Sequence, residues 1–147
     1  MICVVDASVA VKWFVQGLWA QREEHVDQAL ALLQAIHADR VTMRQPPHFL
    51  AEVAAVLARL DPQGVARHVA WLDCLDIDHA EPTEHLTTAL ELSLSLNHHL
   101  FDTLYHAVAL DTPDALFITA DRRYFDKAAS RGRIVWLPDW VDTTASH

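Results

Sequence analysis

Four acidic side chains occur where apolar strands end or helices begin, and their type and placement suit chemistry with a divalent cation. They are Asp6 in VVDASVAVKW, Glu52 in PPHFLAEVAAVL, Asp102 in HHLFDTLYHAVAL and Asp121 in LFITADRRYF. A carboxylate beside a buried segment is costly to ionise unless a partner compensates its charge. Carboxylates that converge raise one another's pKa values, and a cation held by oxygen ligands relieves that repulsion. The pattern therefore predicts a metal site.

Each acid taken singly also has a simpler interpretation as a helix cap. Asp6, Asp102 and Asp121 all suit N-cap or first-turn positions, which the helix dipole favours. Glu52 is harder to explain in this way, because it lies inside an apolar helix and we expect no basic partner at positions 48, 49, 55 or 56. Capping explains the four positions less well if all of them meet at one edge of a sheet.

Oxygen ligands favour Mg²⁺ or Mn²⁺ over zinc, which prefers histidine and cysteine. Two such ions, roughly 3.5–4 Å apart, activate water and stabilise the leaving oxygen of a phosphodiester. Ser8 and Thr119 each stand two residues from one of the acids. Their hydroxyls suit hydrogen bonds to a carboxylate or to metal-bound water. Local capping for Ser8 and strand propensity for Thr119 are equally simple interpretations.

Histidines near Asp102 offer a second kind of chemistry. His98, His99 and His106 surround it, and a histidine–aspartate pair for base catalysis is conceivable. We favour surface or structural roles for these histidines, because no matching nucleophile is apparent.

Basic residues are few but locally concentrated. The net charge of −9 argues against non-specific nucleic-acid binding through a basic surface. Five of the eleven lysines and arginines nevertheless fall within residues 122–133. A solvated helix face explains most of them. Arg122, Arg123 and Lys12 are weak candidates for contacts with the phosphate groups of a ligand.

The elements that must position these side chains are short apolar strands alternating with helices. Strands are predicted at 2–6, 41–43, 75–78, 115–119 and 134–137, and helices at 22–38, 48–60, 62–74 (with Asp61 as N-cap), 83–96, 102–111 and 122–130. This alternation predicts a parallel sheet with helices on both faces. Ligands of such folds bind beyond the carboxyl ends of the strands. Asp6 and Asp121 then share one edge, which helices carrying Glu52 and Asp102 can reach.

The length of 147 residues predicts one domain, over residues 1–141, followed by a disordered polar tail at 142–147. No apolar run approaches the roughly 20 residues that span a bilayer. The N-terminus shows neither a basic n-region nor a cleavage signal. We therefore expect a cytoplasmic protein with no membrane association.

The stretches VVDASVAVKWF, PPHFLAEVAAVL, FDTLYHAVAL and FITADRRYF together resemble PIN domains, and specifically the VapC toxins of bacterial toxin–antitoxin pairs. They occur in the family's order and spacing and cover both ends of the chain. Residues 62–97 match only as helix–strand–helix. The resemblance implies a three-layer α/β/α PIN fold with a central parallel sheet. It also implies an Mg²⁺- or Mn²⁺-dependent endoribonuclease toxin of a type II toxin–antitoxin module.

The resemblance further implies roles for particular residues and partners. It carries the catalytic and metal-binding acids onto Asp6, Glu52, Asp102 and Asp121, and the supporting hydroxyls onto Ser8 and Thr119. It implies a homodimer, held inactive by a VapB-type antitoxin, that cleaves RNA with a metal-activated water. Whether Asp126 joins the acids stays open.

Two alternatives remain open on the sequence alone. One is a different metal-dependent phosphoryl hydrolase, such as a haloacid-dehalogenase-like phosphatase. That enzyme would need a second aspartate where Ser8 stands. The other is a catalytically silent PIN-like module that only binds a protein partner.

Overall fold

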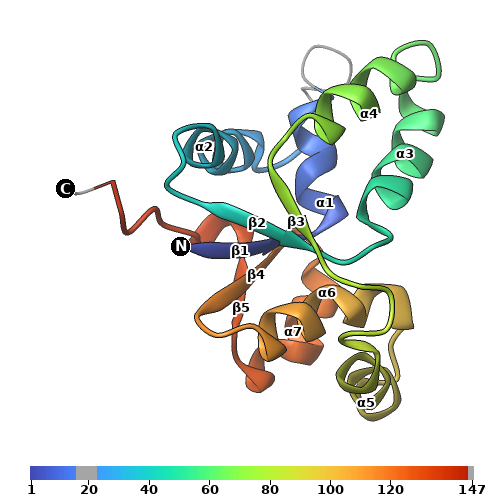
Figure 1. The fold of residues 1–147 in the computed structure, drawn as a ribbon, viewed down its shortest axis with the longest axis vertical. Helices are drawn as coiled ribbons and strands as arrows, with labels where there is room; N and C mark the ends of the chain where they lie inside the picture. The colour runs from blue at the N-terminus through green and yellow to red at the C-terminus, as the bar shows by residue number, and fades with distance from the viewer. Residues whose placement is uncertain (16–22, 146–147) are drawn as a thin grey trace.

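A five-stranded, fully parallel sheet forms the centre of the computed structural model, which describes residues 1–15 and 23–145 (Figure 1). The strands are β1 (Ile2–Val5), β2 (Thr42–Gln45), β3 (Ile77–His79), β4 (Ala115–Thr119) and β5 (Ile134–Trp136). Their order across the sheet is β3-β2-β1-β4-β5. The central strands are almost wholly apolar because helices cover both of their faces, as parallel sheets require.

Helices lie on both faces of this sheet, which confirms the predicted three-layer α/β/α arrangement. They are α1 (Ala7–Ala10), α2 (Val26–His37), α3 (Phe49–Leu60), α4 (Val65–Asp73), α5 (Leu86–Leu96), α6 (Leu100–Asp111) and α7 (Arg122–Ala128), with short 3₁₀ turns at Val11–Trp13, Ala129–Arg131 and Leu137–Asp139. Helices α1 to α4 cover one face, and α5 to α7 cover the other (Figure 1). Within the described residues, no helix is long and apolar enough to cross a membrane.

The chain begins in the middle of the sheet, and this placement creates a switch point. From β1 the sheet grows outward through β2 and β3, and the chain then returns to add β4 and β5 on the other side. The register pairs Val5 with Ile118, so β1 and β4 end almost level with each other. Asp6 and Asp121 follow these two strands. The prediction that they share one sheet edge is therefore confirmed, at the crevice where such folds bind ligands.

Several predicted boundaries differ from the observed ones for identifiable reasons. The helix expected from residue 62 begins at Val65, with Gly64 as its N-cap. Asp61 does accept from Gly64 N at 3.1 Å, as a capping aspartate would, but residues 62–64 form a turn ahead of the helix. The second strand runs over Thr42–Gln45 rather than 41–43, and the third over Ile77–His79 rather than 75–78.

The first part of the predicted polar tail makes a defined contact. Arg40 Nε donates to Asp142 Oδ2 at 2.7 Å, and the Thr144 hydroxyl donates to Asp142 Oδ1 at 2.6 Å. These hydrogen bonds lower the pKa of Asp142 to about 2. Residues 146–147 lie outside the described residues.

Candidate active site

Asp6 stands where β1 ends and α1 begins, and its side chain is buried in the edge of the sheet. Thr119 Oγ1, at the end of the neighbouring strand β4, donates to Asp6 Oδ2 at 2.6 Å. Burial raises the pKa of Asp6 to about 6; the Thr119 hydrogen bond lowers it and the charge of Asp102 raises it. Asp6 is therefore a carboxylate whose ionised form lacks a full compensating charge from the protein.

The two predicted hydroxyls connect the loops that follow β1 and β4. Thr119 Oγ1 also accepts from Asp121 N at 3.0 Å, so one hydroxyl contacts two of the acidic residues. Ser8 Oγ accepts from Ala120 N at 3.1 Å. Both side chains thus fix the relative positions of the two loops that carry Asp6 and Asp121.

Glu52 projects from the first turn of α3 toward the same edge. Burial raises its pKa to about 7, and repulsion by Asp6 and Asp102 adds to this effect. The Tyr105 hydroxyl donates to Glu52 Oε1 at 3.3 Å.

The expectation that Glu52 has no basic partner at position 48 was wrong. His48 lies one helical turn earlier, which is the spacing at which side chains on a helix meet. Its Nε2 lies 3.5 Å from Glu52 Oε2. Burial nevertheless lowers the pKa of His48, so this partner loses its charge more readily than an exposed histidine.

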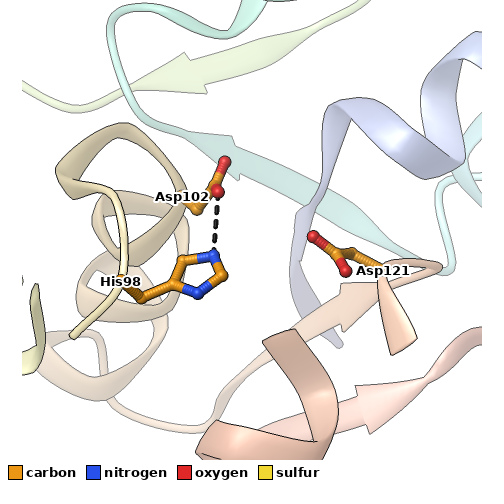
Figure 2. Close-up of side chains that lie close together, drawn as sticks. All are labelled: His98, Asp102 and Asp121. Atoms are coloured by element: carbon orange, nitrogen blue, oxygen red, sulfur yellow. Dashed lines mark hydrogen bonds and ion pairs between the residues drawn. The ribbon is translucent and has the colours of Figure 1, made fainter. Parts of the chain in front are cut away.

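Asp102 and Asp121 complete the group from two further helices. Asp102 lies in the first turn of α6, and Asp121 is the N-cap of α7, where it accepts from Tyr124 N at 3.1 Å. His98, Asp102 and Asp121 each offer a ligand atom within 4.8 Å of the others. Figure 2 shows these three side chains close together, with the contact between His98 and Asp102 dashed. The capping interpretation is correct for Asp6 and Asp121, yet both caps also face the same space as the other acids.

That space is a pocket of about 400 Å³. Its polar lining comprises Asp6, Ser8, Lys12, Glu23, Glu52, Asp102 and Asp121. Lys12 does not offset the four predicted acids, because its Nζ donates to Glu23 Oε1 at 2.5 Å and to Glu24 O at 2.7 Å. Carboxylates in excess, two of them with raised pKa values, form a donor set that fits a divalent cation.

A comparison with known families agrees with this geometry. Residues 3–130 match the family model of the PIN domain. The chain belongs to the PIN domain family. PIN domains are generally metal-dependent nucleases that use divalent ions, and the nuclease fold is therefore shared by this chain. Among the curated proteins, no match to the chain was found.

Two of the predicted phosphate-binding residues of this PIN domain, Arg122 and Arg123, are exposed on α7. Arg122 is exposed at the start of α7, directly after Asp121, and its guanidinium lies 5.3 Å from the Trp136 ring centroid. Its Nε also lies 3.0 Å from Asp126 Oδ1. Arg123 is exposed on the same helix. Asp126 therefore pairs with Arg122 on the outer surface and is not among the residues that line the pocket.

The histidines of the PIN domain separate into structural and site-facing groups. His106 is buried, with Nδ1 2.9 Å from the Tyr124 hydroxyl and Nε2 2.8 Å from Gly132 O. Burial lowers its pKa, which suits the structural role that we expected. His98 instead contacts Asp102, with Nε2 2.9 Å from Oδ2. The sequence offered one signal of this contact, the spacing of four residues between His98 and Asp102, at which side chains on a helix meet.

Two other pocket contacts had little or no signal in the sequence. Tyr105 lies three residues after Asp102, and only the packing of α6 against the sheet brings its hydroxyl to Glu52. Glu23 lines the pocket and pairs with Lys12. It lies in residues 23–25, which precede α2 and have no regular secondary structure. Neither placement follows from strand or helix periodicity.

Proposed function

We propose that this PIN domain is an Mg²⁺- or Mn²⁺-dependent endoribonuclease and acts as the toxin of a VapC-type toxin–antitoxin module. The observation that carries the proposal is the convergence of Asp6, Glu52, Asp102 and Asp121, from four separate segments, on one pocket at the sheet edge. Structural carboxylates seldom gather in this way without a cation, since each raises the pKa of the others. The resemblance of the surrounding motifs to VapC toxins supports the choice of RNA as substrate.

The four acids have different environments, which suit different tasks. A divalent cation, when bound, supplies charge stabilisation and lowers the pKa of a water molecule. Asp6, Asp102 and Asp121 lie at the sheet edge and would be its main ligands. Glu52 lies across the pocket on α3, with a pKa raised to about 7. It would either join the ligands or orient the attacking water.

Contacts with the RNA backbone would come from the surface beside Asp121. Arg122 and Arg123 are exposed there, and guanidinium groups bind phosphate well. Lys12 would contribute only if its ammonium leaves Glu23. Because the pocket itself is acidic, these arginines and the bound cations would have to attract the polyanion.

The nuclease proposal is tested with purified protein and total RNA, with Mg²⁺, with Mn²⁺ or with a chelator. We expect discrete products that disappear in chelator and that Asp6→Asn does not form. Asp73→Asn is the matched control, because Asp73 is exposed at the end of α4 and does not line the pocket. Wild-type cleavage by a folded Asp6→Asn variant would show that the metal site is wrongly placed.

The same assay separates the two alternatives. Absence of cleavage for every RNA in every metal would favour a binding module without catalysis. Hydrolysis of a phosphate monoester such as p-nitrophenyl phosphate, without RNA cleavage, would favour a different phosphoryl hydrolase.

The toxin proposal needs its own test in cells. We expect induced expression of the wild type to arrest bacterial growth. Growth should continue when Asp6→Asn is expressed, or when the wild type is co-expressed with the product of an adjacent short gene. Size-exclusion chromatography with light scattering would test the proposed homodimer and its complex with such an antitoxin. Growth arrest by Asp6→Asn at equal expression would contradict the proposal.

A further inference from the structure

His98 lies beside the acids and is nearly buried, but it is not among the proposed metal ligands. Its side chain is 9% exposed, whereas that of Asp102 is 40% exposed. Its Nε2 lies 2.9 Å from Asp102 Oδ2. A ring nitrogen of His98 also lies within 4.8 Å of a carboxylate oxygen of Asp121. Two roles are compatible with these distances. His98 either binds the cation through Nε2 or donates a hydrogen bond that fixes Asp102.

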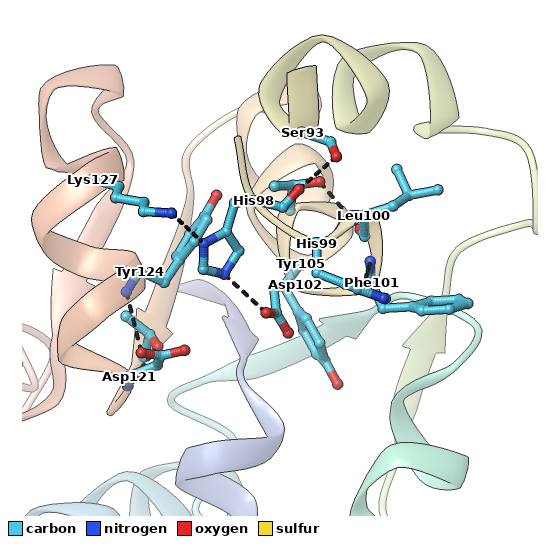
Figure 3. Close-up of polar contacts among 12 residues, drawn as sticks. Ser93, His98, His99, Leu100, Phe101, Asp102, Tyr105, Asp121, Tyr124 and Lys127 are labelled. Carbon is cyan, nitrogen blue, oxygen red and sulfur yellow. Dashed lines mark hydrogen bonds and ion pairs between the residues drawn. The ribbon is translucent and has the colours of Figure 1, made fainter. Parts of the chain in front are cut away.

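Lys127 distinguishes between the two roles. Its Nζ lies 3.3 Å from His98 Nδ1, a contact that Figure 3 marks with a dashed line. Nζ also donates to Asn97 O at 3.2 Å. An ammonium group has hydrogen-bond donors and no acceptor, so Nδ1 must accept from it. The ring hydrogen is then on Nε2, where it is donated to Asp102. A nitrogen that carries a hydrogen has no lone pair for a cation, so the contact with Lys127 favours the donor role.

The position of the His98 ring is determined by contacts outside the acidic group. His98 N donates to Ser93 O at 3.1 Å, and Ser93 Oγ donates to His98 O at 2.6 Å. Asn97 ends α5 in the left-handed conformation, with φ of 48°, and so turns the chain toward the site. The ring packs edge-on against buried Tyr124, with centroids 4.8 Å apart. Hence contacts outside the acidic group hold the His98 ring beside Asp102.

We propose that His98 is a positioning residue: it holds Asp102 by donating from Nε2 to Oδ2, with Lys127 fixing the ring tautomer, and leaves the other carboxylate oxygen for the cation. The inference rests on the proposed function, because it requires that Asp102 binds the metal ion. Hydrogen-bonded partners of metal ligands commonly orient them and increase affinity.

The first test is calorimetric titration of the whole protein with Mn²⁺ alone and with Mg²⁺ alone. We expect His98→Ala to weaken binding about 10-fold or more. His98→Gln should recover most of that loss, because its amide nitrogen occupies the place of Nε2 and donates. His79→Ala is the matched control, since His79 is exposed on β3 and is not among the residues that line the pocket. Thermal unfolding in chelator would verify that each variant is folded.

The second test is NMR of protein with ¹⁵N-labelled histidine, which reports the nitrogen that carries the hydrogen. We expect the His98 hydrogen on Nε2 in chelator and still on Nε2 after Mg²⁺ is added. Loss of that hydrogen on addition of Mg²⁺, with no rescue by His98→Gln, would overturn the inference and show a direct ligand.

Asp102→Asn separates failure of this inference from failure of the proposed function. If Asp102→Asn binds the metals as tightly as the wild type, the proposed metal site is wrong. If Asp102→Asn loses affinity while His98→Ala retains it, the site is correct and His98 does not position it.

Discussion

At the scale of single residues, Thr119 shows how one side chain can serve two acids. Its hydroxyl donates to Asp6 and accepts from the backbone of Asp121, so both hydrogen-bonding capacities are used across the edge of the sheet. Because the side chain is fully buried, no solvent replaces these bonds when they are lost.

Thr119→Val should therefore weaken Mn²⁺ binding about 10-fold while costing about 1–2 kcal/mol of unfolding free energy. Thr103→Val is the matched control. Thr103 is also fully buried, but its hydroxyl lies 2.9 Å from Ala89 O on α5 and 3.1 Å from Leu100 O, and it donates its one hydrogen to these carbonyls rather than to an acid. It should cost similar stability and leave metal affinity unchanged. Equal metal affinity in the two variants, measured by calorimetry, would argue against the positioning role of Thr119.

Glu52 illustrates how a site acid makes stability depend on pH. Its pKa is raised to about 7 in the folded protein from an ordinary value of 4.5, chiefly by burial. The folded state then binds more protons than the unfolded state between these two pH values. Its ionisation therefore destabilises the fold progressively as pH rises through that window.

Glu52→Gln removes this cost, so in chelator its stability advantage over the wild type should be absent below about pH 4.5 and complete above about pH 7. We expect about 1–2 kcal/mol at the upper end, after allowing for solvent screening of a partly exposed group. Urea unfolding across pH measures it. Glu91→Gln, at an exposed glutamate, is the control. An advantage that grows toward low pH would contradict the assigned pKa shift.

At the scale of elements, a side chain takes over the hydrogen bonding between β1 and β2 at the carboxyl end of these strands. The registered pairing of β1 with β2 covers only Ile2 with Thr42 and Cys3 with Met43. Beyond it, Gln45 replaces the missing backbone partner. Its Nε2 donates to Val5 O, and its Oε1 accepts from Val5 N, both at 2.8 Å. Val5 precedes Asp6, so Gln45 supports the position from which that acid projects.

Gln45→Met should lower the unfolding free energy by roughly 2–4 kcal/mol, because it leaves two buried backbone groups unpaired with little change in volume. Denaturant unfolding measures the loss. Gln34→Met makes the same substitution at an exposed position of α2 and should change stability by less than about 0.5 kcal/mol. Similar losses in both variants would show that methionine itself, and not the lost pair of hydrogen bonds, is responsible.

At the scale of the whole molecule, the acidic pocket is a source of instability that the proposed cation would remove. The chain carries a net charge of −9, and the pocket concentrates carboxylates; burial and then the charge of neighbouring acids raise the pKa values of Asp6 and Glu52. A ligand that binds only the folded state stabilises it in proportion to the logarithm of its concentration. With the proposed metal site, metal binding and folding would therefore be coupled.

Mn²⁺ at about 100 times its dissociation constant should stabilise the protein by about 2.7 kcal/mol, or roughly 5–10 °C in melting temperature. Calorimetric scans with metal and with chelator measure the shift. Asp6→Asn should melt above the wild type in chelator, since it removes a buried carboxylate, and should gain little from metal. A larger metal shift in Asp6→Asn than in the wild type would contradict the proposed coordination.

Much of the frame followed from local patterns. Apolar strands such as ALFIT have both faces covered, and their alternation with helices implies a parallel sheet. The positions of Asp6 and Asp121 after two strands then placed them at one edge, and the family was recognisable from the four motifs. Element ends were less predictable. A turn at 62–64 separates Asp61 from the helix that it was expected to cap, and strand ends depend on pairing across the sheet, as at Gln45, which periodicity does not show.

The sequence by itself therefore determined the fold class and the family, since burial periodicity and motif order are properties of the chain. Only the tertiary structure decided several of the contacts around the acids that join separate segments of the chain. The pairing of Lys12 with Glu23, the reach of Tyr105 to Glu52 and the contact of Lys127 with His98 all join separate elements. Such contacts depend on how helices pack on the sheet, and short-range spacing carries no information about that packing.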